Sequence, residues 1–237
     1  MRQVGRELSM CGRFIDTVLF ASASFPVSVK DSYASKLIYF TKLAERESRF
    51  RATFKSLRHT FDSPRPTAFW CHEDDEYYWR TLVLGRTKHK QGTLTRRTYK
   101  LFHVALRKLL RNQKKVFSKA SPRLLSGPGG SCDVISQAVE SLQDNTTDPG
   151  RFLAATKLLQ GGKLFFTASG NPGFTGPGAR VGDIVCVFNG SLTPHVIRRV
   201  PGQGKETYKF VGDAYVHGLM NGEVDEMNLQ DREFVMV

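Results

Sequence analysis

The chain has 237 residues, of which 40% are hydrophobic and 24% are charged. This length and composition are typical of one globular domain or two tightly packed subdomains, and they exclude a largely disordered protein. The net charge of +13 belongs to the first 120 residues, which hold 25 Lys and Arg against 10 Asp and Glu, whereas the remainder holds 10 against 12.

An apolar segment, residues 7–29, opens the chain and predicts one or two strands around Gly12. Arg13 and Asp16 interrupt its apolar run, so a secretory signal peptide is not predicted. No apolar run in the sequence reaches the roughly 18 residues that a membrane-spanning helix needs. We therefore expect residues 1–30 to form a strand-like region of a non-membrane protein.

Helices are predicted for most of residues 31–160. Asp31 can cap a helix that runs to about His59, because Tyr, Leu and Phe recur there at helical spacing and basic residues fill the other face. Residues 73–85 predict a shorter helix, whose four initial acidic residues suit the positive end of the helix dipole.

The most basic segment lies between Tyr77 and Cys132, which contains 14 Lys and Arg and no acidic residue. Residues 98–118 predict an amphipathic helix with aromatic and Leu side chains on one face. The opposite face carries Lys100, Arg107, Lys108, Arg111, Lys114 and Lys115. Such a face can bind an acidic partner, nucleic acid or anionic lipid, although a solvated face on a docked helix is the simpler interpretation.

The last third of the chain predicts short strands separated by Gly/Pro turns. Two short helices precede it, at 134–142 and, with Asp148 as its N-cap, at 149–160. The strands are predicted at 163–168, 183–189, 194–200 and 207–217, with a short helix at 221–230 and a closing strand at 233–237.

These elements predict an α+β protein in which a helical N-terminal half packs on a small C-terminal antiparallel β-sheet or partial barrel. The expected regions are the strand-like residues 1–30, the helical residues 31–160 with the basic helix, and the β-rich unit of residues 161–237.

The cysteines favour a reducing compartment. Cys11, Cys71, Cys132 and Cys186 are far apart and form no C-x-x-C pair, which is typical of free thiols. We therefore expect a cytoplasmic protein.

No catalytic site is predicted. The Gly-rich runs match no phosphate-binding loop, and the six histidines show no metal-ligand spacing. The best constellation would join Cys186 or Ser191 to His217 and Asp213. Asp213 and His217 are four residues apart on one predicted strand, about 13 Å, which is too far for a carboxylate that orients a histidine. We expect no enzyme, no cofactor and no metal.

Several motifs are concentrated between residues 162 and 223. They comprise K-L-F-F-T from Lys163, Gly182 and Asp183 before I-V-C-V, Pro194 with Arg198, and a long run that contains Gly212, Tyr215, His217, Gly218, Gly222 and Glu223. In this order the motifs resemble the C-terminal region of fungal heterokaryon incompatibility (HET) proteins. Weaker similarities lie at residues 7–20 and at 77–82, which contain Trp79. Asp213, Ala214 and Asn221 depart from the family's usual Glu, Cys and Asp.

The resemblance implies a role in vegetative incompatibility, the fungal non-self recognition that leads to programmed cell death. A segment like residues 7–20 follows the N-terminal HET domain in that family, so the resemblance also implies a truncated chain without the death-inducing domain. We expect a non-enzymatic regulatory or interaction portion whose partner is a protein, such as a full-length HET-type relative. The alternative is binding of nucleic acid or an anionic membrane through residues 98–118.

Overall fold

The computed structural model describes residues 7–27, 33–58, 76–89, 92–118, 131–202 and 205–237. These residues form two compact units, one built from strands and one built mainly from helices. The predicted α+β class is confirmed, because the described residues contain five α-helices and a seven-stranded sheet.

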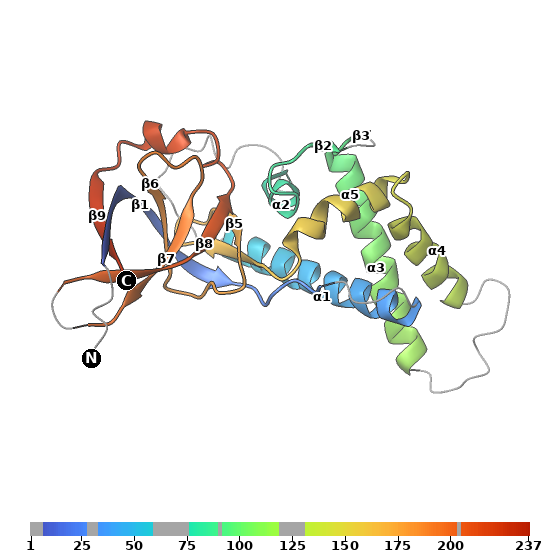
Figure 1. Ribbon diagram of the computed structural model, residues 1–237. Helices are drawn as coiled ribbons and strands as arrows, with labels where there is room; N and C mark the ends of the chain where they lie inside the picture. The colour runs from blue at the N-terminus through green and yellow to red at the C-terminus, as the bar shows by residue number, and fades with distance from the viewer. Residues whose placement is uncertain (1–6, 28–32, 59–75, 90–91, 119–130, 203–204) are drawn as a thin grey trace. The chain divides into compact units, whose positions relative to one another are not determined.

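The strand unit is a sheet that curls into a partial ring (Figure 1). Its strands are β1 (Leu8–Ala21), β4 (Lys163–Thr167), β5 (Pro172–Thr175), β6 (Ile184–Phe188), β7 (His195–Val200), β8 (Thr207–Val216) and β9 (Asp231–Met236). Their order is β4-β5-β8-β7-β6-β1-β9, and the additional pairings β4–β1 and β8–β9 bend the sheet onto itself. Neighbouring strands are antiparallel except for β8 and β9, which pair in parallel.

The N-terminal strand β1 lies inside this sheet, between β6 and β9. Figure 1 shows it in blue among the orange and red C-terminal strands. Its first half pairs with β9 and its last residues pair with β4. Ile15 and Val18 of β1 are buried in the core, so these apolar side chains explain why the strand is enclosed.

Strand β5 was not predicted, because it lies within a Gly/Pro run that is typical of turns. Gly173 pairs with Phe165 of β4, and a Cβ atom added at Gly173 would lie 2.3 Å from the Phe165 ring. The absence of a side chain at this position therefore lets the two strands approach while the aromatic ring fills the space. Pro172 is tolerated because it is the first residue of the strand.

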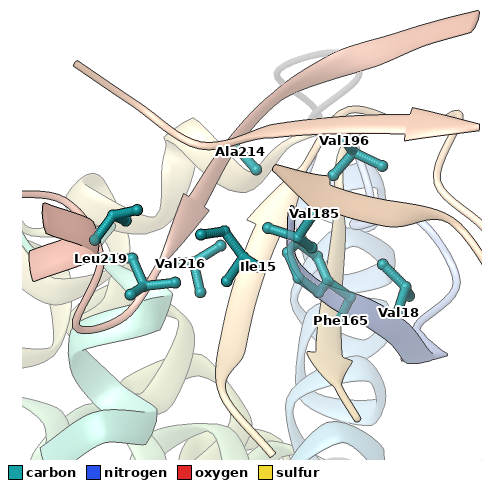
Figure 2. Close-up of a cluster of buried hydrophobic side chains, with 9 residues drawn as sticks. Ile15, Val18, Phe165, Val185, Val196, Ala214, Val216 and Leu219 are labelled. Carbon is teal, nitrogen blue, oxygen red and sulfur yellow. The ribbon is translucent and has the colours of Figure 1, made fainter. Parts of the chain in front are cut away.

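The core of the strand unit is formed by hydrophobic side chains from most of the strands (Figure 2). Its buried members are Ile15, Val18, Phe165, Val185, Val196, Ala214, Val216, Leu219 and Val224. Burial of each large side chain in such a cluster contributes roughly 1.5–3 kcal/mol to folding. The core therefore holds together strands from both ends of the sequence.

The second unit contains most of α1 (Tyr33–Arg58) and α2 (Glu76–Leu82), the two-stranded ribbon of β2 (Lys88–His89) and β3 (Gly92–Thr93), then α3 (Arg96–Ser118), α4 (Ser131–Gln143) and α5 (Asp148–Thr156). Helix α3 packs against both α4 and α5.

The N-cap of α5 is Thr147, one residue before the predicted Asp148. The Thr147 hydroxyl accepts a hydrogen bond from the Gly150 N–H, because a threonine just outside the first turn can reach that amide. The predicted cap Asp31, the helix end at His59 and the acidic residues 73–75 lie outside the described residues.

The two described cysteine side chains differ in exposure, and this difference gives a first prediction. Cys11 is exposed, whereas Cys186 is buried, and burial raises the pKa of the Cys186 thiol to about 12 despite the nearby charge of Arg232. At pH 8 we expect iodoacetamide to modify Cys11 at least about 1000-fold faster than Cys186, because the thiolate is the reactive species. Mass spectrometry of the digested protein measures both rates. Similar rates in the folded protein, or a disulfide between the two cysteines, would contradict this expectation.

Candidate functional site

The six basic residues predicted as an interaction surface all belong to α3. The side chains of Lys100, Arg107, Lys108 and Arg111 are exposed, and those of Lys114 and Lys115 lie outside the described side chains. On the same helix Tyr99, Phe102 and Leu106 are buried, as the amphipathic pattern predicted. Leu101 and Val104 are exposed as well, so the solvent-facing side of α3 mixes cationic and apolar groups.

Helix α3 is joined to α1 and α2 by a buried carboxylate, Glu47, which is only 2% exposed. The hydroxyl of Tyr99 donates to Glu47 Oε1 over 3.0 Å, and that of Tyr78 lies 3.0 Å from the Glu47 carbonyl oxygen and 3.3 Å from Oε1. His103 Nδ1 lies 3.1 Å from the same carboxylate oxygen. Burial, followed by the charge of Glu47, raises the pKa of Tyr78 well above its ordinary value. Helix α3, which carries the basic face, is therefore held to α1 by buried contacts of Tyr99 and His103 with Glu47.

In the strand unit, Asp183 and Arg198 form an ion pair with two parallel hydrogen bonds. Arg198 Nε donates to Oδ1 over 2.7 Å and Nη2 donates to Oδ2 over 2.8 Å, while the Arg180 N–H donates to Oδ2 over 2.7 Å. Asp183 is 1% exposed and follows a turn at Gly182, whose φ of +89° favours glycine. The hydrogen bonds to Asp183 raise the pKa of Arg198. The motif residues Gly182, Asp183 and Arg198 therefore attach the loop before β6 to strand β7.

Other motif residues lie at the end of β8 and just beyond it. The hydroxyl of Tyr215 lies 3.0 Å from His217 Nδ1. Burial opposes the charge of Glu223, but hydrogen bonds from the Asn221 backbone and side chain, helped by His217, hold the pKa of Glu223 below its ordinary value. Gly218 and Gly222 have φ values of +82° and +90°, a backbone conformation that favours glycine at both positions.

The remaining motif residues have structural contacts. The carbonyl oxygen of Pro194 accepts from the Ala214 N–H over 2.8 Å, and Gly212 pairs with Val196 across β7 and β8. Trp79 is buried in the helical unit, where its ring centroid lies 6.5 Å from that of Phe152.

The structure pairs Asp213 with His195, and not with His217. His195 and Asp213 are direct partners across β7 and β8, and His195 Nδ1 lies 3.0 Å from Asp213 Oδ1. On the other side of the ring, His195 Nε2 lies 2.7 Å from the Ser191 Oγ. Sequence reasoning missed His195, because the register of β7 against β8 includes a β-bulge between Val196 and Ile197 that no local pattern reveals.

The described residues contain neither a metal-binding cluster nor a membrane-spanning helix. The described part of the chain holds no group of three or more His, Cys, Asp or Glu side chains that could bind a metal ion. Among its helices, none has both the length and the apolar character that crossing a lipid bilayer requires.

The sheet that curls into a partial ring, with motif residues in its strands and turns, defines the class of protein as a small barrel-like β domain in a chain that also contains helices. The chain belongs to the Het-6 β-barrel family, since the model of the Het-6 beta-barrel domain matches residues 75–237, more than half of the chain. It is 43% identical over 67 residues to Heterokaryon incompatibility protein 6, OR allele, of Neurospora crassa. That match covers 28% of this chain and only 10% of the relative. No solved structure matches the chain.

These matches confirm the predicted relationship to heterokaryon incompatibility proteins at the level of the family. They give no support to the expectation that the chain is only the portion outside a HET domain, because the Het-6 domain is present in the chain itself. The match begins at residue 75, so it does not include β1, although β1 pairs with three strands of the matched region.

Proposed function

We propose that this chain acts in the cytoplasm of a fungal cell as an interaction module of heterokaryon incompatibility, and that it recognises a protein partner. The observation that carries this proposal is the family match over residues 75–237, together with the similarity to a protein named for heterokaryon incompatibility. We further expect these 237 residues to recognise the protein partner and not to cause cell death by themselves.

The exposed face of α3 is the surface that best suits such a partner. It offers Lys100, Arg107 and Arg111 beside the exposed apolar groups of Leu101 and Val104. Protein interfaces commonly combine arginine with apolar contacts, whereas a surface that only binds phosphates needs no apolar groups. This composition supports an acidic protein surface as the partner.

The test uses two triple variants with the same change of net charge. The α3 variant carries Lys100→Glu, Arg107→Glu and Arg111→Glu. The control carries Arg180→Glu, Lys205→Glu and Lys209→Glu, three exposed positions of the strand unit. Each protein is expressed in a fungal strain that is paired with an incompatible strain carrying the heterokaryon incompatibility protein 6 relative, and dead fused cells are counted by vital dye.

We expect the unaltered chain alone to leave growth unchanged and to alter the fraction of dead fused cells at least about twofold. The control variant should keep this effect and the α3 variant should lose it, since only the latter reverses the charge of the contact surface. Growth arrest by the chain alone, or an equal effect of both variants, would contradict the proposal. Salt-sensitive binding of duplex DNA or anionic vesicles that only the α3 variant loses would favour the alternative instead.

A further inference from the structure

We propose that Ser191, His195 and Asp213 form a hydrolytic triad, in which Ser191 is an acyl-accepting nucleophile for ester substrates. This inference concerns the strand unit and does not depend on the partner proposed for α3. The contacts are Ser191 Oγ to His195 Nε2 at 2.7 Å and His195 Nδ1 to Asp213 Oδ1 at 3.0 Å. Both lie within the reach that a nucleophile, a general base and an orienting carboxylate require.

The hydrogen bonds define the state of the imidazole ring. A carboxylate can only accept, so the proton between His195 and Asp213 belongs to Nδ1 of His195. In the neutral ring Nε2 then carries a lone pair and accepts the hydroxyl proton of Ser191. The Thr193 N–H, 3.3 Å from Ser191 Oγ, donates to the same oxygen and holds it near the ring. The Thr193 carbonyl oxygen, at 3.0 Å, is a second acceptor for the hydroxyl proton.

Paired strands hold two of the three side chains in place, and the connection between β6 and β7 holds the third. Ser191 lies in the loop between β6 and β7, His195 begins β7, and Asp213 is the partner of His195 on β8. The ring of His195 stacks on Phe188 with centroids 5.2 Å apart, and its side chain is 13% exposed. Groups on paired strands keep their geometry better than groups on loops, so His195 and Asp213 are organised before any substrate binds, and the contacts of Ser191 with His195 and Thr193 hold the nucleophile beside them.

The reaction that follows from this geometry is balanced with water as the only co-reactant. Ser191 Oγ attacks the ester carbonyl carbon while His195 Nε2 takes the hydroxyl proton. The bond from carbon to the alcohol oxygen breaks, and His195 returns the proton to the departing alcohol. Water then attacks the acyl-serine with His195 again as base, which releases the acid and restores Ser191. Whenever His195 holds the extra proton, the Asp213 carboxylate stabilises the charged imidazole.

The surroundings of the triad indicate the class of substrate. Leu192, next to the nucleophile, is 90% exposed, and Phe210, whose ring centroid lies 5.6 Å from that of His195, is also exposed. Two solvent-facing apolar side chains at a polar site favour an apolar group on the substrate. Asp213 is 78% exposed and disfavours anions nearby. We therefore infer an uncharged ester with an alkyl or aryl group.

The experiment labels the purified 237-residue protein with an alkyl fluorophosphonate, which reacts with activated serines, and follows hydrolysis of p-nitrophenyl butyrate. The expected result is one adduct per chain, located on Ser191 by peptide mass spectrometry. Ser191→Ala and His195→Gln should abolish labelling, and Asp213→Asn should slow it at least about 100-fold because the imidazole loses its orientation and charge stabilisation. Ester hydrolysis should fall in parallel.

Ser9→Ala is the matched control, since Ser9 is an exposed serine of the same sheet whose hydroxyl donates to the Glu233 carboxylate and not to an imidazole. Labelling should be unchanged in this variant. Because the Asp213 side chain is mostly exposed, Asp213→Asn should fold normally, and it therefore tests the triad even if His195→Gln fails to fold. Absence of an adduct on the folded protein, or full labelling of Ser191 in Asp213→Asn, would overturn the proposal and leave the three residues as a clamp on the hairpin.

Discussion

Replacing Asp183 with alanine is expected to lower the free energy of unfolding of the strand unit by about 3 kcal/mol, because it leaves Arg198 without its partner and the Arg180 amide without its acceptor. The loop before β6 should also lose its attachment to β7. Urea denaturation followed by circular dichroism measures the loss. Hydrogen exchange with mass spectrometry should show that the substitution increases the exchange rate more in β6 and β7 than in α3.

Asp213→Asn provides the comparison for this prediction, because it changes a carboxylate in the same sheet that is 78% exposed. Its cost should stay within about 0.5 kcal/mol, as is usual for exposed positions. Equal stability losses in Asp183→Ala and Asp213→Asn would show that the buried ion pair does not hold the loop. In that case the conformation at Gly182 would be the main constraint on the turn.

Replacing Glu47 with alanine should destabilise the helical unit by about 3 kcal/mol, since a buried acceptor is removed from Tyr99 and His103, and Tyr78 keeps only its hydrogen bond to the backbone carbonyl of residue 47. Glu47→Gln should cost less, because the amide oxygen still accepts a hydrogen bond. The matched control is Glu45→Ala, on the same helix at an exposed position, for which the expected change is within about 0.5 kcal/mol.

The measurement for Glu47 is hydrogen exchange of α1, α2 and α3 together with urea denaturation. Opening should increase in all three helices, because the carboxylate accepts hydrogen bonds from α2 and α3 while it belongs to α1. A loss confined to α1 would show that the three helices pack through apolar contacts alone. An unchanged midpoint would contradict the role assigned to the carboxylate.

The sequence was sufficient for features that depend on local periodicity. The spacing of Tyr99, Phe102 and Leu106 predicted the buried face of α3, and apolar runs located β6 and β7 to within a residue or two at each end. It was insufficient where a Gly/Pro run becomes a strand, as at Gly173. There the deciding contact is with Phe165, which belongs to another strand, so no rule for turns could reveal it.

The candidate sites show the same difference between features set by the pattern of one element and features set by contacts between elements. The exposed basic residues of α3 were predicted individually, because exposure follows from the pattern of one helix. Glu47 is one of several charged residues in its stretch of α1, and only the arrival of Tyr78 and Tyr99 from other helices makes it a buried anchor. Likewise, sequence spacing placed Asp213 and His217 on one strand, too far apart for direct contact, whereas the register between β7 and β8 pairs Asp213 with His195.

The position of β1 in the sheet affects how the protein is made. The ribosome synthesises β1 before its partners: β4 begins about 140 residues later, and β6 and β9 follow later still. During that interval the helical unit can fold, but Ile15 and Val18 have no strand to cover them. A nascent chain that exposes an apolar strand for so long is a substrate for chaperones and is prone to aggregate. Slow translation between α1 and β4 would therefore lower the yield of folded protein, whereas faster synthesis or extra chaperone would raise it.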